Sequence, residues 1–326
     1  MNTIGKILTL STFGESHGPA MGGVLDGVPA GVDIDLDALQ RFVDRRRPGQ
    51  TVGASSRGEQ DRVEVLSGIW QGKTLGTPIG FIVRNTDARS EDYEPLARCF
   101  RPNHADYTWQ VKYGIRDPRG GGRASARETV ARVVAGGIAM QVLGRLGITI
   151  EAVARAADAA TLQRVMADGD TLGGIIECVV HGAPAGLGEP VYGKLHARLA
   201  AAMMSIPSVH GFEYGDGFEM AAKRGSEVMD TFEKRDDGSI GTATNHSGGI
   251  QGGISNGEDI VMRVAFKPVP TLMREVPTVD RDGNPVTLPP RGRHDVCVVP
   301  RAVPVVEAMA ALVILDNYLI KKTNVL

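Results

Sequence analysis

Residues 24–31 read Val-Leu-Asp-Gly-Val-Pro-Ala-Gly, and residues 179–186 read Val-Val-His-Gly-Ala-Pro-Ala-Gly. Each stretch is a strand-like run that enters a G-x-P-A-G turn. The recurrence of this unit in both halves of the chain predicts an internal duplication, although an eight-residue match between common turns can also arise by chance. Strands and helices around both stretches lack a regular βαβ alternation, which favours an α+β fold over a doubly wound sheet.

The rest of the chain divides into strand-like and helix-like segments. We expect a strand from Ile4 to Phe13, a turn at Gly14–Gly18, a strand from Met21 to Leu25, and more strands over Val63–Arg84. The first expected helix begins at Asp35-Leu36-Asp37, has Arg45–Arg47 as its last turn and stops at Pro48-Gly49. The longest is expected over Ser125–Leu146, and two more over Gly193–Met204 and Val303–Leu319.

The composition is that of an ordinary globular protein. The chain has 326 residues, 42% of them hydrophobic, and a net charge of −2, and we treat residues 1–326 as one domain. Cys99, Cys178 and Cys297 are scattered without a C-x-x-C spacing, so we expect no disulfide framework, no metal and a cytoplasmic location. No run has the form of a signal peptide or the length of a membrane span, so we expect no membrane partner.

Arginine is concentrated in a few glycine-rich or proline-rich segments. The clusters are Arg45–Arg47, Arg101–His104, Arg116–Arg127 and Arg291–Asp295. Guanidinium groups suit carboxylates and phosphates, so converging clusters would form a pocket for a small polyanion. For the first cluster alone, complementing a helix dipole is the simpler explanation. Nucleic acid is the competing ligand, but the net charge is not basic, 5% of residues are aromatic and no nucleic-acid module is present, so we expect no such partner.

A glycine loop precedes the longest expected helix. Residues 117–129 read Asp-Pro-Arg-Gly-Gly-Gly-Arg-Ala-Ser-Ala-Arg-Glu-Thr, and Ser125 and Glu128 have capping-box spacing. Glycines and free N–H groups at a helix start favour an anion, with charge supplied by Arg123 and Arg127. The loop matches neither a P-loop nor a dinucleotide fingerprint. A plain capped helix is the alternative interpretation.

Two histidines lie in turns where a side chain can face a cleft. His17 and His104 are flanked by Gly, Pro, Asn, Ser and acidic residues, and His294 lies between Arg293 and Asp295. Histidine titrates near neutrality and suits general acid catalysis on an anionic leaving group. A single histidine is more often structural or solvent-facing, so position alone does not assign a role.

Five long motifs resemble those of the chorismate synthase family, in family order. Such ordered motifs are far more specific than one glycine loop, and the similarity extends from Ile4 to about Leu319. The motifs are Gly14–Gly18, Arg45–Gly49, Arg101–Asp106, Arg123–Thr129 and Gly292–Asp295.

The resemblance implies a β-α-β sandwich, with helices between two antiparallel sheet layers, that assembles as a homotetramer. It implies the anti-1,4-elimination of phosphate from 5-enolpyruvylshikimate 3-phosphate to give chorismate, the last common step of aromatic amino acid biosynthesis in the shikimate pathway. Reduced FMN is required, because it donates electron density transiently as the C–O bond breaks. Some members reduce the flavin themselves with NADPH. This chain is short and lacks a Rossmann fingerprint, so we expect an external flavin reductase or another source of reduced FMN.

The resemblance also implies roles for individual residues. His17 is similar to the acid that protonates the departing phosphate, His104 to the acid that protonates the reduced flavin, and Asp295 to the group that assists proton removal. The residues similar to those that bind the substrate are Arg46, Arg47, Arg101, Arg127 and Arg293. The residues that match flavin-contact positions are Arg123, Ala124, Ser125, Pro207, Ser208, Gly252, Lys267, Pro268, Val269, Pro270, Thr271 and Arg293.

The chain departs from the family pattern in three places. Many relatives have an arginine six positions after the residue that matches Arg46, where this chain has Val52, so the contact is missing or is supplied by a residue such as Arg57. Residues 267–271 read Lys-Pro-Val-Pro-Thr and have fewer hydroxyl groups than the family stretch. The region 150–171 is shorter than in many relatives. These changes bear on FMN affinity and on contacts between subunits.

Two other functions stay open on the residues alone. One is a different phosphate-eliminating or phosphoryl-transferring enzyme that uses the arginine pocket without flavin. The other is an RNA-binding protein. A requirement for reduced flavin separates the first from the main hypothesis, and a steep salt dependence of polynucleotide binding would support the second.

Overall fold

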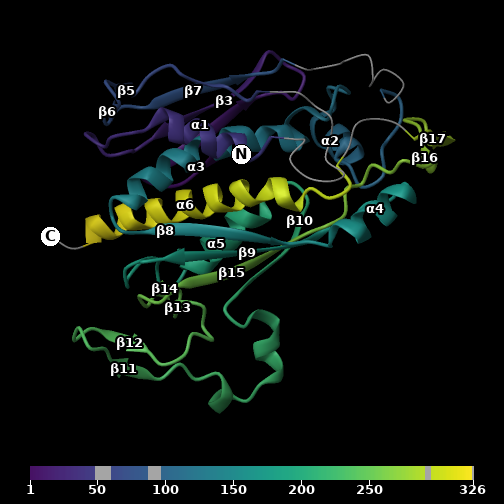
Figure 1. Ribbon diagram of the computed structural model, residues 1–326. Coiled ribbons are helices and arrows are strands. Elements are labelled where there is room, and N and C mark those ends of the chain that lie inside the picture. The colour runs from purple at the N-terminus through teal and green to yellow at the C-terminus, as the bar shows by residue number, and fades with distance from the viewer. Residues whose placement is uncertain (48–59, 87–96, 291–294, 325–326) are drawn as a thin grey trace.

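Two antiparallel sheets enclose a layer of helices. The computed structural model describes residues 1–47, 60–86, 97–290 and 295–324. In Figure 1 the first sheet lies above, and the second below, helices α1 (Leu36–Asp44), α3 (Thr129–Gly144) and α6 (Val299–Asn324). Helix α5 (Leu195–Met204) packs between α6 and the second sheet. This arrangement confirms the α+β class predicted from the pattern of strands and helices, and it is the sandwich that the family resemblance implies.

The first sheet has the strand order β1-β2-β3-β7-β4, and each neighbouring pair is antiparallel. Side chains on its inner face, such as Met21, Leu25 and Phe81, are buried against the helices because successive strand residues point to opposite faces. The strands are β1 (Thr3–Ile4), β2 (Thr9–Gly14), β3 (Ala20–Asp26), β4 (Val63–Val65) and β7 (Ile79–Arg84), with a small hairpin of β5 (Ile69–Trp70) and β6 (Lys73–Thr74).

The single strand expected from Ile4 to Phe13 is wrong. The chain bends at Gly5, whose φ is +101°, and β1 then pairs with β2. Asp316 of α6 holds the bend, because its carboxylate accepts hydrogen bonds from the backbone N–H groups of Lys6, Ile7 and Leu8 at 3.0, 2.8 and 2.9 Å. The acceptor lies about 310 residues further along the chain, so no local pattern reveals this break.

The second sheet has the order β10-β15-β9-β8 and is also antiparallel throughout. Its strands are β8 (Thr149–Arg155), β9 (Gly174–His181), β10 (Val209–Tyr214) and β15 (Ile260–Phe266). Shorter elements complete the described residues: α2 (Asp106–Tyr113), α4 (Ala159–Ala167) and the hairpins β11 (Phe232–Lys234) with β12 (Ile240–Thr242), β13 (Ile250–Gln251) with β14 (Ile254–Ser255), and β16 (Val276–Val279) with β17 (Pro285–Leu288).

The two halves of the chain share one topology. Strands β2-β3-β7-β4 of the first half and β8-β9-β15-β10 of the second occupy corresponding places in their sheets and follow the same order along the chain. The two G-x-P-A-G turns lie at equivalent points, between β3 and α1 and between β9 and α5. Each half ends in a central helix, α3 or α6, and these helices pack so closely that a Cβ at Gly136 would lie 2.3 Å from the Cβ of Ala308. The structure therefore agrees with the duplication predicted from the sequence echo.

Several helix boundaries differ from the expected ones. Helix α1 ends at Asp44, so Arg45–Arg47 follow the helix, and its expected stop at Pro48-Gly49 lies outside the described residues. Helix α3 begins at Thr129, after a 3₁₀ turn, and the Ser125 hydroxyl accepts from Arg127 N at 3.3 Å, so the capping box expected at Ser125 does not form. The longest helix is α6, with 26 residues, rather than α3.

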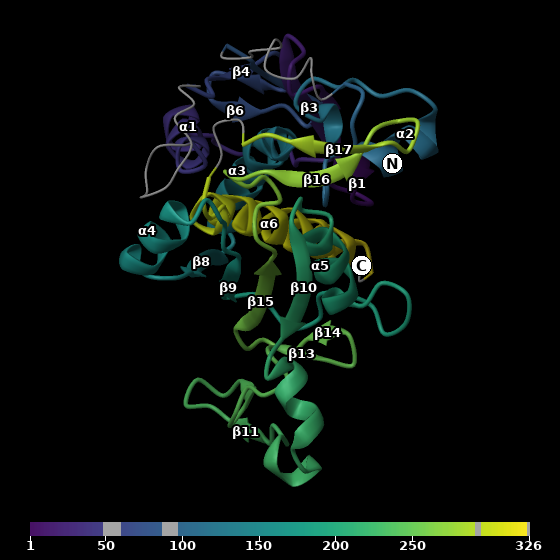
Figure 2. The same cartoon turned by 90° about the vertical axis from the view of Figure 1, so that its right-hand side faces the viewer.

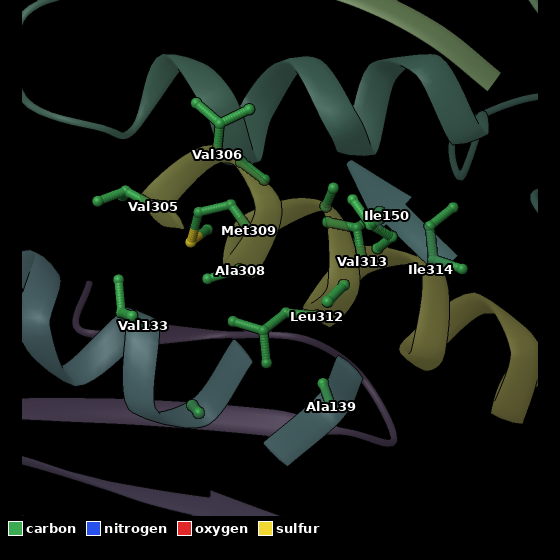
Figure 3. Close-up of a cluster of buried hydrophobic side chains, with 14 of the residues drawn as sticks. Val133, Ala139, Ile150, Val305, Val306, Ala308, Met309, Leu312, Val313 and Ile314 are labelled. Carbon is green, nitrogen blue, oxygen red and sulfur yellow. The ribbon is translucent and has the colours of Figure 1, made fainter. Parts of the chain in front are cut away.

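Helix α6 is the centre of the core. In Figure 3, Ala308 and Leu312 of α6 face Val133 and Ala139 of α3, while Val306 points toward α5. Among the described residues, α6 alone has the length and apolar composition of a membrane span, which corrects the expectation that no stretch reaches this length, yet 78% of its apolar window is buried inside the protein. The apolar length of α6 therefore serves contacts with β8 and β9 of the second sheet and with α3 and α5.

An arm between β10 and β15 projects away from the sandwich. It contains two 3₁₀ turns, η4 (Gly217–Ala222) and η5 (Gly225–Glu227), followed by the hairpin of β11 and β12. Figure 2 shows the arm extending below β13 and β14, away from both sheets. Its large apolar side chains, among them Phe218, Phe232 and Ile240, are exposed.

Candidate active site

The candidate site residues gather at one end of the sandwich. The turn after β2, the segment after β7 and the starts of α3 and α6 meet at the right-hand end of the molecule in Figure 1. Because the halves share one topology, residues 85–128 between β7 and α3 are equivalent to residues 267–298 between β15 and α6. Both halves thus contribute their crossover segment to one site.

His17 lies in the turn after β2 and is 7% exposed. Its Nδ1 is 3.2 Å from the hydroxyl of Ser16. The imidazole packs against the backbone of Gly120, where a Cβ would lie 2.1 Å from Cε1 of His17. Asp117 lies close enough that His17 helps to lower the pKa of its carboxyl, although the hydrogen bond from Arg119 is the main cause of that shift. The first half of the glycine loop therefore forms one wall around His17.

Arg46 and Arg127 share one buried carboxylate, that of Asp61. Arg46 Nη1 donates to Asp61 Oδ2 at 2.9 Å, and Arg127 Nη1 donates to Asp61 Oδ1. Arg127 Nε also donates to Asn85 Oδ1 at 3.0 Å, and Asn85 Nδ2 donates to the carbonyl oxygens of Glu15 and Gly18 on either side of His17. Two of the expected substrate-binding arginines are thus tied to each other and to the turn of His17.

Arg101 is held by a second carboxylate. Arg101 Nε donates to Asp106 Oδ2 and Arg101 Nη2 donates to Asp106 Oδ1, each at 2.8 Å. Arg116 Nη1 lies 3.0 Å from Asp106 Oδ1. Burial raises the pKa of Asp106, but hydrogen bonds and charge from Arg101, with a smaller contribution from Arg116, bring it below its usual range. Arg101 also approaches the glycine loop, since a Cβ at Gly121 would lie 3.7 Å from its Nη2.

His104 joins the two crossover segments. Its Nδ1 is 3.0 Å from the carbonyl oxygen of Pro102, and its Nε2 is 3.2 Å from the hydroxyl of Thr271. Beside it, Lys267 Nζ donates to the carbonyl oxygen of Asn103 at 3.0 Å. An open pocket that includes Arg101 and His104 is lined by residues 100–104, by Tyr107 and Thr108, and by the β16–β17 hairpin. A histidine and a lysine from opposite halves of the duplicated fold therefore meet here.

Asp295 lies just before α6 and is almost fully buried. Its carboxylate pairs with Arg301 Nη1, and Arg301 Nε donates to the backbone oxygen of Arg46 at 3.1 Å. Asp295 is therefore connected to the pair of Arg46 and Arg127. The neighbouring Arg293 and His294 lie outside the described residues, as do Val52 and Arg57.

The first arginine cluster separates into three different contacts. Arg45 makes a bidentate pair with Glu307 of α6 at 2.7 and 3.0 Å, and Arg47 lies 3.7 Å from Asp44. Burial raises the pKa of Glu307 despite the opposing charge of Arg45. In this cluster, only Arg46 makes the contact with Asp61. Arg45 is a structural cation between α1 and α6, and the expected substrate contact of Arg47 stays a prediction.

The expected flavin residues fall into separate groups. Lys267 N donates to Ser208 O at 2.9 Å, which places Pro207-Ser208 beside residues 267–271, and Thr171 Oγ1 donates to Val269 O at 2.7 Å. Arg123 instead donates to Thr12 Oγ1 at 2.7 Å in the first sheet, with Ala124 and Ser125 beside it in the chain. Gly252 lies in the β13–β14 turn, near the start of β15, whereas Lys267 follows the end of β15. The seven residues of β15 therefore separate Gly252 from Lys267 by about 20 Å within one chain.

Several residues that hold this site together are not among those predicted from the sequence. Asp61, Asn85 and Asp106 each bind a predicted site arginine. Asp106 ends the Arg101–Asp106 motif, and its position in that motif was an available signal. Asp61 and Asn85 lie outside the quoted motifs, and their contacts come from distant segments.

The fold and the site define an α+β sandwich protein in which arginines, histidines and carboxylates are held together at one end. A sequence model of the family described as chorismate synthase matches residues 8–319. Chorismate synthase of Parabacteroides distasonis is 52% identical over 356 aligned positions, which cover 99% of each chain, and that of Bacteroides fragilis is 52% identical over 353 positions, which cover 98% of each. A crystal structure of a chorismate synthase superposes with a TM-score of 0.77 at 30% identity and covers 98% of this chain and 93% of its own.

The chain belongs to the chorismate synthase family. It is a lyase that acts on a phosphate, and it forms chorismate in the shikimate pathway, which leads to the aromatic amino acids.

Proposed function

We propose that the site at the crossover end of the sandwich eliminates phosphate from 5-enolpyruvylshikimate 3-phosphate with the help of reduced FMN. The observation that supports this most strongly is the convergence of His17 and Asp295, from distant segments, on the buried pair of Arg46 and Arg127. His104 lies on the segment of Arg101 and contacts Thr271 of the other half. The substrate carries a phosphate and two carboxylates. A site of low dielectric with several fixed guanidinium groups strengthens each contact with these anions.

His17 is the proposed proton donor to the departing phosphate. The imidazole is almost fully buried and is fixed by Ser16 and by the backbone of Gly120. Arg127 and Arg46, linked to the same turn through Asn85, are the proposed cations that stabilise charge on the leaving group. A buried acid held beside fixed cations suits this step, since the phosphate gains negative charge as the C–O bond breaks.

Asp295 is the proposed group that assists removal of the ring proton. Its pairing with Arg301, which also binds the backbone of Arg46, fixes the carboxylate relative to the substrate-binding arginines. Acid and base then lie in opposite halves of the duplicated chain, because His17 follows β2 and Asp295 precedes α6. An arrangement with acid and base on different segments suits an anti elimination, in which the two leaving groups depart from opposite faces of the ring.

Residues around His104 fit a reduced flavin. The side chains of His104, Thr271 and Lys267 supply hydrogen-bond donors and positive charge. The anionic ring edge and the phosphate ester of reduced FMN need both. These three residues would hold the flavin, and the backbone at Pro207-Ser208 would flank it. When bound, reduced FMN supplies electron density to the substrate as the C–O bond breaks. The place of Gly252 in this site stays a prediction, because it lies at the other end of β15.

An anaerobic assay tests this function and its main rival together. Protein, 5-enolpyruvylshikimate 3-phosphate and chemically reduced FMN should give chorismate, followed by its absorbance, and released phosphate. Omission of the flavin should abolish both products. Phosphate release that does not need flavin would instead support an elimination or phosphoryl-transfer enzyme of another kind.

We also propose a homotetramer, a cytoplasmic location and an external source of reduced FMN. The exposed apolar side chains of the arm, including Phe218, Phe232 and Ile240, support an assembly, because apolar groups gathered on one projection are typical of subunit contacts. Light scattering at micromolar concentration should give the mass of four chains. The mass of one 34.6 kDa chain would contradict the assembly.

A further inference from the structure

Asp61 lies between two buried arginines that come from different segments. Its side chain is fully buried, and those of Arg46 and Arg127 are 6% and 3% exposed. One carboxylate oxygen accepts from each guanidinium group. Two cations this close in a buried place repel each other unless an anion lies between them. Asp61 supplies that anion.

Four further hydrogen bonds from the two arginines go to neutral acceptors. Arg46 donates to Thr129 Oγ1 at 3.0 Å and to Ala126 O at 3.3 Å. Arg127 donates to Asn85 Oδ1 at 3.0 Å and to Arg84 O at 3.4 Å. These contacts orient each guanidinium plane, but none of them links one arginine to the other or offsets its charge.

The network around Asp61 continues in two directions. On one side, Arg127 binds Asn85, and Asn85 binds the backbone on either side of His17. On the other side, the backbone oxygen of Arg46 accepts from Arg301, which pairs with Asp295. Asp61 therefore lies in the middle of a chain of contacts that runs from the proposed acid to the proposed base.

We propose that Asp61 is a positioning residue, which holds Arg46 and Arg127 in the geometry that binds the anionic groups of the substrate. This inference rests on the proposed function of the site. Asp61 has a φ of +47°, a conformation that Asp and Asn adopt more readily than other residues with a side chain. Asn is therefore the matched replacement, since it keeps the shape and the backbone conformation and removes the charge.

The test compares D61N, D61G and a control in the complete enzyme with saturating reduced FMN. In D61N the amide nitrogen faces one guanidinium group, so one arginine loses its acceptor. We expect KM for 5-enolpyruvylshikimate 3-phosphate to rise about 10- to 100-fold, because both arginines bind anionic groups of the substrate before the reaction. We expect kcat to fall by a smaller factor, because the same arginines stabilise charge on the leaving group. In D61G, added acetate should restore much of the KM by occupying the vacated carboxylate position, without altering the wild type.

The control is D33N. Asp33 also accepts from two basic side chains, Lys73 and Arg145, but it is exposed and lies beside the C-terminal end of α3, whereas Asp61 lies at its start. D33N should leave KM unchanged. The dissociation constant for FMN should be the same in all four proteins, because Asp61 acts on the substrate arginines.

Three results would overturn the inference: a KM in D61N within about twofold of the wild type, a lower KM, or a loss of kcat at constant KM that follows the folded fraction measured by circular dichroism. A lower KM would show that Asp61 competes with the substrate for the arginines. Calorimetric titration with the substrate separates this question from the proposed function. If the wild type binds the substrate but makes no chorismate, the proposed function is wrong. The role of Asp61 then still requires that D61N binds the substrate about tenfold more weakly than the wild type does.

Discussion

Gly120 and His17 are in direct contact, and a side chain at position 120 would enter the imidazole ring. The Cβ would lie 2.1 Å from Cε1 and 2.2 Å from Nδ1 of His17, and the φ of Gly120 is +61°. A side chain at position 120 must therefore displace the proposed acid. The contact ties the start of the glycine loop to the turn after β2, although the two lie about 100 residues apart.

Gly120→Ala should lower kcat by about 100-fold or more, because a displacement of the acid by about 1 Å is enough to cost that factor. Gly31→Ala is the control, since Gly31 has a φ of +80° with no atom within 4 Å of its Cβ position and carries only the backbone strain. Steady-state kinetics and thermal melts of both variants make the comparison. Equal kcat losses in both variants would show that the effect is backbone strain rather than displacement of His17.

His17→Gln should reduce kcat by about 10²- to 10⁴-fold, because it removes the proposed proton donor while keeping a polar side chain. His17 is buried rather than on a surface turn, so we also expect a lower melting temperature. His210→Gln, at an exposed histidine of β10, should alter neither property. Near-normal turnover of the His17 variant would remove it from the mechanism.

His104→Ala should lose activity together with a changed pH profile of kcat, since the proposed role depends on a titrating group near the flavin. Thr271→Val removes the hydroxyl that lies 3.2 Å from Nε2 of His104 and should shift the same profile more weakly, whereas Thr271→Ser should restore it. Thr323→Val, which removes an exposed hydroxyl that donates to a local backbone oxygen near the C-terminal end of α6, is the control. An unchanged profile in His104→Ala would exclude the role.

Asp230→Asn should destabilise the protein at neutral pH. Burial raises the pKa of Asp230, but hydrogen bonds from Ser247, Thr244 and the backbone of His246 lower it to about 2. A folded pKa below the unfolded value of about 3.9 means that the carboxylate stabilises the protein above pH 4, and that this contribution disappears as the pH falls toward 2. We expect a loss on the order of 2 kcal/mol at pH 7, measured by urea unfolding. An equal difference between variant and wild type at pH 7 and at pH 2 would contradict this origin.

Purified protein with oxidised FMN and NADPH as the only reductant should make essentially no chorismate in the dark. The chain lacks a dinucleotide fingerprint, so we expect no reductase activity of its own. Activity should appear once dithionite or a separate reductase supplies reduced FMN. Sustained dark turnover on NADPH, with contaminating reductases excluded, would show that the protein reduces its own flavin.

The pattern of strands and helices predicted the α+β class, and the repeated turn predicted the duplication. The family resemblance implied the layered sandwich and most of the segments that meet at the site. Turns with G-x-P-A-G and arginine-rich loops are local features, which can be recognised in a single sequence. The break at Gly5 was missed because it depends on the carboxylate of Asp316, which lies about 310 residues away in the chain. The start of α3 at Thr129 was missed because a 3₁₀ turn over Ala126–Glu128 precedes the helix, and the hydrophobic pattern does not distinguish the two.

The internal arrangement of the site was less accessible to sequence reasoning. Four arginine clusters suggested one pocket, but Arg45 binds Glu307 in the core, and Arg46 and Arg127 share Asp61. Which carboxylate each arginine binds is decided by contacts between distant segments. Such contacts leave no periodicity in a single sequence.

The most direct test of flavin-dependent phosphate elimination compares the amounts of chorismate and phosphate formed with the amount of flavin present. Wild-type protein is incubated anaerobically with 5-enolpyruvylshikimate 3-phosphate and a small, known amount of reduced FMN, and chorismate, phosphate and the redox state of the flavin are measured together. We predict many molecules of chorismate for each FMN, one phosphate for each chorismate, and flavin that is still reduced at the end. Chorismate formation without flavin, phosphate release without chorismate, or oxidation of one flavin per turnover would contradict the claim.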